Sequence, residues 1–369
     1  MAIDKVVSAS ITDSSVTSAK VASGVLQPNF RNIVINGDMS IAQRGTSASS
    51  LTGSAYNTID RFQTSLTTLG TWTQSQSTTV PTGQGFVSSL KMDCTTADAS
   101  PASGDNLKIR TKFEGKNLQY LKKGTSSAES LTLSFWVRSN KTGTYIVELM
   151  DNDNSFRHIN KSYTISSADT WEKKEITFAG DTTGALDNDN GAALEMSFYL
   201  GAGSGLTSGT LQTSWGAYEA TNRAVGQVNL ADSTSNEWYI TGVQLEVGTA
   251  ASDFEFLPHD VNLNRCRRYY ERFVYNEEMY WIGTGFAESN TDVRIVLLYH
   301  PKRGNPSASF SGQIRVDPGN RTATSMSFDS MKTRSGLFYG SFSASGSTND
   351  AYSMRFNTSG SEIELNSEL

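Results

Sequence analysis

The sequence predicts an all-β protein with an N-terminal repetitive leader, a jelly-roll β-sandwich and a smaller C-terminal β-sandwich. Two observations predict this class. The 369 residues include 50 Ser, 39 Thr, 17 Phe, 14 Tyr and 6 Trp, a composition rich in residues that fit pleated sheets and their turns. Short apolar stretches also alternate with turns rich in Gly, Asn and Asp along most of the chain. Both observations disfavour a helical bundle and a doubly wound nucleotide-binding enzyme.

Charge and hydropathy restrict the partners. The net charge of −6 and the pI near 5.3 offer no basic field for a phosphate backbone, so we expect no nucleic-acid partner. No apolar run approaches the roughly 18–20 residues of a membrane helix, so we expect no membrane insertion. Cys94 and Cys266 lie far apart, form no C-x-x-C pair and are predicted to be buried free thiols. The N-terminus has no long apolar stretch of a secretion signal, which favours synthesis in a reducing cytoplasm.

The first 28 residues carry one apolar side chain at every fifth position. These residues are Val6, Ile11, Val16, Val21 and Leu26. A period of five fits neither an α-helical face nor a simple strand, and such a row cannot be buried by a short segment alone. We therefore expect residues 1–28 to assemble with identical copies or with a docking partner, with this row at the oligomer interface. A disordered leader with chance spacing is the alternative.

Residues 29–262 carry the pattern of a jelly-roll sandwich. Leu131, Leu133, Phe135 and Val137 alternate with other side chains, as in a strand with one buried face. Further strands are expected at 145–149, 175–178, 196–200 and 238–247. The last of these changes parity at Gly242, which predicts a β-bulge. Strands separated by such turns favour a β-sandwich.

Residues 263–369 are predicted to form the second, smaller sandwich. A dense cluster of Arg and Tyr at 262–272 predicts a short helical turn or bridging element at its start. Alternation at 293–299 and apolar stretches at 337–339, 352–356 and 363–365 predict its strands.

Motifs for catalysis and metal binding are weak. His158, His259 and His300 lack zinc-site spacing, and no nucleophile elbow or phosphate-binding loop is present. The tetrads 151–154 and 187–190 alternate Asp with Asn and could supply oxygen ligands to a structural calcium ion, or form Asx turns between strands. A carboxylate pair for glycoside cleavage could also be drawn from them. We expect no catalytic residues and no cofactor, and we leave the metal content open.

Aromatic residues beside turns are the best candidates for a binding site. Flat rings exposed on a β-sandwich can stack on sugars while nearby polar groups bond the hydroxyls. Trp136, Trp171 and Trp238 lie in or beside apolar alternation and are predicted to pack in the core. The candidates that lie near Gly/Ser/Thr-rich turns are Trp72, Trp215, Tyr218, Tyr280 and Trp281. Packing under loops or between subunits is the alternative for them.

Several motifs resemble the tail-fibre proteins of tailed phages, especially marine and cyanobacterial ones. Residues 32–45 and 56–62 resemble the opening of that family, and residues 239–248, 254–258 and 266–271 resemble its closing signature. The leader is similar to the Val-Thr-x-Ala-Lys repeats that often precede such domains. The resemblance covers residues 1 to about 272. The residues after about 272 resemble the family only in their general character, without a matching motif.

This resemblance implies a component of the virion tail, assembled in the host cytoplasm, whose jelly roll is similar to carbohydrate-binding modules. It implies a homotrimeric fibre or receptor-binding protein whose partners are other copies, other tail or virion proteins, and a host cell-surface glycan. The matched motifs are structural, so no catalytic residue is transferred. Thr241 stands near the place where some such modules carry a calcium-binding aspartate, which puts an inherited metal site in doubt. A head fibre or tail adaptor is the first alternative, and a surface-polysaccharide depolymerase is the second.

Overall fold

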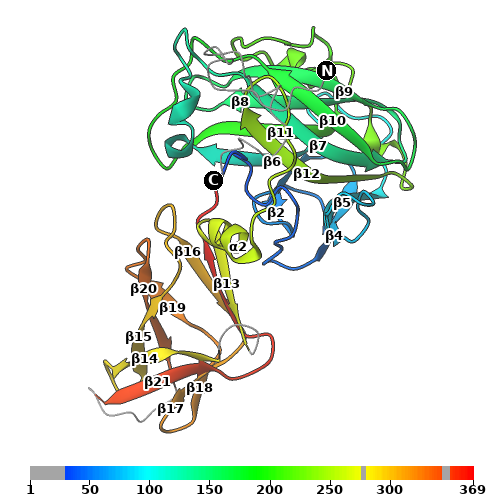
Figure 1. Cartoon of the computed structure of the whole chain (residues 1–369). Helices are drawn as coiled ribbons and strands as arrows, with labels where there is room; N and C mark the ends of the chain where they lie inside the picture. The colour runs from blue at the N-terminus through cyan, green and yellow to red at the C-terminus, as the bar shows by residue number, and fades with distance from the viewer. Residues whose placement is uncertain (1–29, 276–279, 343–349) are drawn as a thin grey trace, which may run out of the picture.

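The computed structural model describes residues 30–275, 280–342 and 350–369, and these fold almost entirely into antiparallel β-sheets (Figure 1). The predicted all-β class is therefore confirmed. The interface row Val6, Ile11, Val16, Val21 and Leu26 lies outside the described residues, so its role stays a prediction. Among the described helices, none has the length and apolar character needed to cross a membrane.

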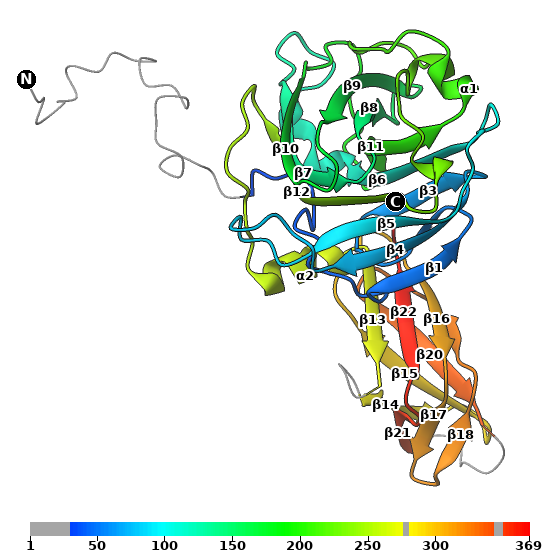
Figure 2. The same ribbon diagram turned by 90° about the vertical axis from the view of Figure 1, so that its right-hand side faces the viewer.

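Two six-stranded sheets form the larger sandwich (Figures 1 and 2). The first sheet contains, in spatial order, β1 (Ser47–Leu51), β4 (Thr71–Ser77), β5 (Ser89–Thr96), β12 (Glu237–Val247), β7 (Leu131–Ser139) and β10 (Glu172–Phe178). The second contains β2 (Ala55–Tyr56), β3 (Gln63–Thr67), β6 (Asn106–Glu114), β11 (Ala192–Ala202), β8 (Gly143–Asp151) and β9 (Arg157–Ile165).

The core between these sheets is aromatic. Phe135 comes from the alternating stretch of β7, and its ring centroid lies 5.1 Å from those of Tyr163 and Phe198 on the opposite sheet. Trp72 and Trp238 are also fully buried. The period-two pattern of the sequence thus identified the core face of β7 correctly.

The predicted bulge in β12 is confirmed. The pairing of β12 with β7 shifts between Thr241 and Gln244, and Gly242 adopts a φ of 62°. A Cβ atom at Gly242 would lie 2.6 Å from the ring of Phe86. Glycine is required here both for the left-handed backbone and for the close approach of that ring.

Helices are short and lie in the connections. They are η3 (Gly115–Asn117), η4 (Gln119–Leu121), α1 (Ser204–Thr207), η5 (Ala220–Asn222), η6 (Leu230–Asp232) and α2 (His259–Arg267). The predicted helical turn in the Arg/Tyr-rich region corresponds to α2. The predicted free thiols are confirmed, since Cys94 and Cys266 are both buried and unpaired.

The connection after β11 covers part of the outer face of the second sheet. Ile146, Tyr199 and Ala224 pack together there. Arg223 forms an ion pair of 2.6 Å with Glu148, whose side chain is 0% exposed. Because the chain itself covers this part of the face, a ligand cannot lie there without displacing the connection.

The smaller sandwich consists of a three-stranded and a seven-stranded sheet. The first is formed by β13 (Tyr270–Val274), β22 (Glu362–Asn366) and β16 (Ser307–Ser311). The second is formed by β18 (Arg321–Ala323), β17 (Ile314–Asp317), β21 (Ala351–Phe356), β14 (Trp281–Ala287), β15 (Asp292–Leu298), β20 (Ser335–Ser341) and β19 (Ser327–Asp329). Ile295, Phe338, Met354, Phe356 and Ile363 are among its buried core residues.

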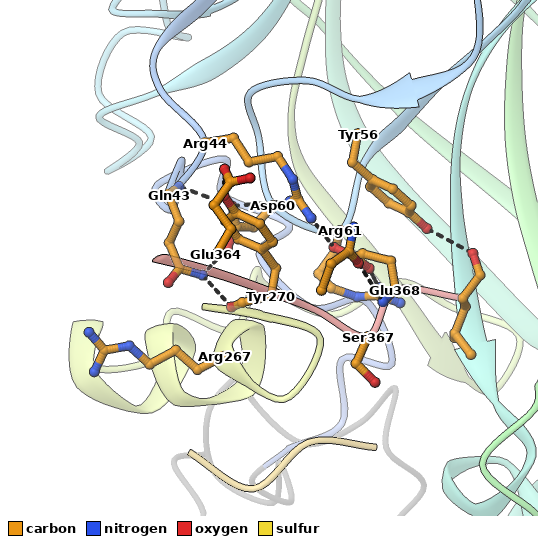
Figure 3. A network of polar contacts seen from close by, with 12 residues as sticks. Gln43, Arg44, Tyr56, Asp60, Arg61, Arg267, Tyr270, Glu364, Ser367 and Glu368 are labelled. Atoms are coloured by element: carbon orange, nitrogen blue, oxygen red, sulfur yellow. Dashed lines mark hydrogen bonds and ion pairs between the residues drawn. The ribbon is translucent and has the colours of Figure 1, made fainter. Parts of the chain in front are cut away.

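A polar network joins the two sandwiches where α2 leads into β13 and the chain returns after β22 (Figure 3). Arg61 is 1% exposed and pairs through Nη1 with the carboxylate of Glu368, which is 5% exposed. Its Nη2 donates to the carbonyl of Lys112 at 2.7 Å, and its Cζ lies 3.5 Å from the centroid of the Tyr269 ring. A buried cation is thus neutralised by a residue that follows the last strand.

A second arginine repeats this arrangement beside the first. The Cζ of Arg44 lies 3.5 Å from the centroid of the Tyr270 ring, and its Nη2 also donates to Glu368 at 3.3 Å. Gln43 donates from Nε2 to the carbonyl of Tyr270 at 2.9 Å. Two cation–π contacts and a shared carboxylate therefore hold the smaller sandwich against the larger one.

Candidate functional site

The structure separates the five predicted stacking residues into three environments. Trp72 is 0% exposed, and its Nε1 donates to the carbonyl of Leu69 at 2.7 Å. The prediction that it stacks on a ligand is wrong, because β4 turns this side chain into the core. Trp72 was nominated because it lies near a turn with polar residues. A turn does not show which side chains of the next strand face the core.

Trp215 and Tyr218 lie together in the connection that covers the second sheet. Trp215 packs against the core, and its Nε1 donates to the carbonyl of Ala179 at 2.7 Å. The Nζ of Lys123 lies 4.4 Å from its ring centroid, in a cation–π contact. Tyr218 is 46% exposed and lies 6.3 Å from the ring of Phe156, which is 51% exposed. Trp215 therefore has a structural role, whereas Tyr218 and Phe156 present ring surface to solvent.

Tyr280 and Trp281 are brought together at the start of β14, in the smaller sandwich. Their exposed fractions are 38% and 52%, and their ring centroids lie 5.6 Å apart at an interplanar angle of 84°. The ring centroid of Tyr275, which directly follows β13, lies 5.7 Å from that of Tyr280. Two exposed rings set at right angles form a corner rather than a flat surface.

Charged groups stand beside this corner because of the strand register. Trp281 is opposite Arg355, and Arg355 is opposite Arg315, so the three side chains form a row across β14, β21 and β17. The Cζ of Arg355 lies 5.1 Å from the ring centroid of Tyr280 and 5.8 Å from that of Trp281. Its Nη1 donates to the hydroxyl of Tyr280 at 2.6 Å.

Asp317 fixes the orientation of both arginines. It accepts from Arg355 Nε at 3.0 Å through Oδ2 and from Arg315 Nε at 3.0 Å through Oδ1. Slight burial opposes ionisation, but the hydrogen bonds from the two arginines prevail and lower the pKa of Asp317. At neutral pH the row, together with Tyr280 and Asp317, therefore presents oriented arginine donors, a carboxylate acceptor and two aromatic rings. We call Tyr280, Trp281, Arg315, Asp317 and Arg355 the tip patch.

A third aromatic group lines a cavity of about 230 Å³ on the outer side of the first sheet. The rings of Phe86, Phe254 and Phe256 lie 4.8–5.1 Å from one another. Trp136 also lines this cavity and is only partly buried, so its predicted place in the core is wrong. Sequence reasoning missed this group, although the Phe-x-Phe spacing at 254–256 placed two rings on one side of an extended segment.

The two Asp/Asn tetrads meet at the edge of the larger sandwich. Asp151 accepts from the backbone of Asp153 and Asn154 and receives Lys123 Nζ at 2.6 Å. Asp153 accepts from the backbone of Asp187 at 2.9 Å. These contacts are Asx turns and an ion pair. Within the described residues, no group of three His, Cys, Asp or Glu side chains is arranged to hold a metal.

Comparisons with known proteins give structural likeness only. No family model and no curated protein matches the sequence. The chain is similar to the enzymatically active domain of bacteriophage CBA120 tailspike protein 4, with 12% identity and a TM-score of 0.32 over 59% of this chain and 22% of that chain. It thus spans about a fifth of the length of that tailspike structure.

Two further solved structures are similar over their full length. TmCBM61 in complex with β-1,4-galactotriose has 9% identity and a TM-score of 0.30, covering 59% of this chain and 99% of that one. The CBM22-1 xylan-binding domain of Paenibacillus barcinonensis Xyn10C has 10% identity and a TM-score of 0.25, covering 57% of this chain and 100% of that one. Identities of 9–12% and TM-scores of 0.25–0.32 carry no argument about function. Function therefore has to be inferred from the side chains of this protein.

Proposed function

We propose that the protein is a non-catalytic structural adhesin of a phage virion, a homotrimeric tail fibre or receptor-binding protein that contacts host surface glycans. The observation that carries the glycan-binding part is the tip patch. It combines two exposed rings with two arginines and a carboxylate held in fixed orientations. A sugar needs both an apolar surface for its ring and directional partners for its hydroxyls.

The phage assignment is supported by the sequence motifs at 32–45, 56–62 and 239–248. In this proposal residues 1–28 attach to the virion and intertwine with their copies, the jelly roll forms the body, and the smaller sandwich presents the tip patch. Three copies would raise the avidity of an individually weak sugar contact. Antibody labelling of virions distinguishes a tail fibre from a head fibre or a tail adaptor.

The strength of the contact can be estimated from Trp281. A tryptophan buries about 150–250 Å² when covered completely, so its 52% exposed fraction leaves roughly 100 Å² of ring surface for a ligand. Covering that area is worth about 1–2.5 kcal/mol at about 25 cal/mol per Å², depending on how much of it the sugar covers. Loss of the ring should therefore weaken binding about 5- to 70-fold.

The test is a glycan array probed with the purified full chain and with two variants. Trp281→Ala removes the proposed stacking ring. Phe286→Ala is the matched control, since Phe286 lies on the same strand and is 51% exposed. We expect Phe286→Ala to retain the array signal of the natural protein and Trp281→Ala to bind the same glycan about 5- to 70-fold more weakly. Equal signals from both variants, or no bound glycan for the natural protein, would contradict the proposal.

A non-catalytic role is tested separately. Incubation of the protein with the bound polysaccharide should release no new reducing ends. Their appearance would instead favour the depolymerase alternative, whose carboxylates would then have to be located.

A further inference from the structure

A cavity of about 370 Å³ lies beside the joint between the sandwiches, and its charge is unbalanced. It is bounded by β6, η4, α2 and the segment that starts at Phe30. Arg61, Lys112, Arg265 and Arg268 line it, whereas Glu114 is the one carboxylate among the described lining residues. A volume of this size is within the range of small-ligand sites.

Three of the four cations already have oxygen partners. Arg268 makes two hydrogen bonds to Glu114, at 2.8 and 2.6 Å, and this carboxylate also accepts from the hydroxyl of Tyr269. Arg61 is paired with Glu368, as described for the joint. Lys112 Nζ donates to the main-chain oxygen of Leu369 at 3.1 Å.

Arg265 is the exception. Its Nη2 makes only a long contact of 3.4 Å to the carbonyl of Asn32 among the described residues, and its Nη1 is buried without a hydrogen-bond partner there. Glu255, the carboxylate whose charge acts on Arg265, is instead paired with Arg31 at 3.8 Å. Burial lowers the pKa of Arg265, which indicates a guanidinium withdrawn from water without full compensation. Such a charge is costly unless an anion approaches it.

Two exposed rings flank the cavity. Phe30 is 59% exposed and Tyr120, in η4, is 50% exposed. A guanidinium with a free donor recognises oxyanions, and flanking rings can cover the apolar face of a sugar.

We propose that this cavity binds an oxyanion, a carboxylate or sulfate group, through Arg265, with Phe30 and Tyr120 favouring an acidic sugar as its carrier. This site lies beside the joint between the sandwiches, whereas the tip patch lies on β14, β21 and β17 of the smaller sandwich. It does not depend on the proposed function, and either site can fail without the other.

Isothermal titration calorimetry of the full chain tests the proposal with three probes: galacturonate, galactose as its uncharged counterpart, and sodium sulfate, all at constant ionic strength. We expect galacturonate to bind and galactose to fail to bind. Stronger binding of galacturonate than of sulfate identifies an acidic sugar as the source of the oxyanion, and the reverse identifies a free anion.

Arg265→Gln removes the charge and the guanidinium fork but keeps a shorter polar side chain, and should weaken the bound probe by at least about tenfold. Arg334→Gln is the control, because Arg334 is exposed on the smaller sandwich and carries the same charge change. Tyr120→Ala provides a second variant that leaves the buried residues intact. It should weaken galacturonate about 3- to 10-fold and leave sulfate unchanged.

Absence of saturable binding by both anions, or equal affinities of Arg265→Gln and the natural protein, would overturn the proposal. Trp281→Ala should leave the titration unchanged, so a failure of the tip patch is distinguishable from a failure of this cavity.

Discussion

Replacing Glu368 by Gln should destabilise the joint between the two sandwiches. The carboxylate of Glu368 neutralises Arg61, which is 1% exposed, and also accepts from Arg44. Removing one member of a buried ion pair typically costs about 3–5 kcal/mol, since the other charge stays buried. The amide oxygen of Gln can still accept one hydrogen bond, and Arg61 retains Tyr269 and the carbonyl of Lys112. We therefore expect a loss near the lower limit, about 3 kcal/mol.

Urea denaturation followed by intrinsic fluorescence measures this loss. The double variant Arg61→Met/Glu368→Leu removes both members of the buried pair and should recover most of the lost stability, because Arg61 no longer leaves a buried charge and Arg44 keeps Asp60 at 3.9 Å. A decrease below about 1 kcal/mol for Glu368→Gln, the value of an exposed pair, would refute the reasoning. A double variant less stable than Glu368→Gln would refute it as well.

Three further changes have defined outcomes. Burial raises the pKa of Asp60 to about 7, so the folded state loses stability as pH rises from about 4 to 7, because the unfolded state releases this proton first. Asp60→Asn has no such proton. In urea titrations its free energy of unfolding should therefore rise relative to that of the natural protein by about 2–4 kcal/mol over that range. Burial opposes ionisation of Glu148, yet hydrogen bonds from Arg223 lower its pKa to about 2. The resulting stability is present above about pH 4.5 and is lost on acidification, a loss that thermal melts of Glu148→Gln should no longer show. Gly242→Ala should cost about 1–3 kcal/mol, because its φ is 62° and the new Cβ would meet Phe86. An unchanged melting temperature would contradict this.

Sequence patterns predicted some of the strands, among them β7, β8, β12 and β15, and several of their details. The alternation at 131–137 identified a core strand because burial on one face imposes a period of two. Gly242 revealed the bulge because the alternation of the sequence changes parity there. The Arg/Tyr-rich region predicted α2, although the network that its neighbours Tyr269 and Tyr270 make with Arg61 and Arg44 depends on contacts far apart in sequence.

The site was less accessible to prediction. Tyr280 and Trp281 could be nominated because they adjoin turns, but the same rule nominated Trp72, which faces the core. The row with Arg315 and Arg355 arises from the pairing of three strands, which no local pattern encodes. Likewise, the deficit of anions around Arg265 becomes visible only when β6, η4 and α2 are brought together.

The central claim, that the tip patch binds glycans through Trp281, is tested most directly by fluorine NMR of the protein labelled with 5-fluorotryptophan. The six tryptophans give six resonances, which single replacements assign. As an oligosaccharide that scores on the array is added, the resonance of Trp281 should shift until saturation, while those of the buried Trp72 and Trp238 stay in place. Saturation of binding with an unmoved Trp281 resonance would contradict the claim.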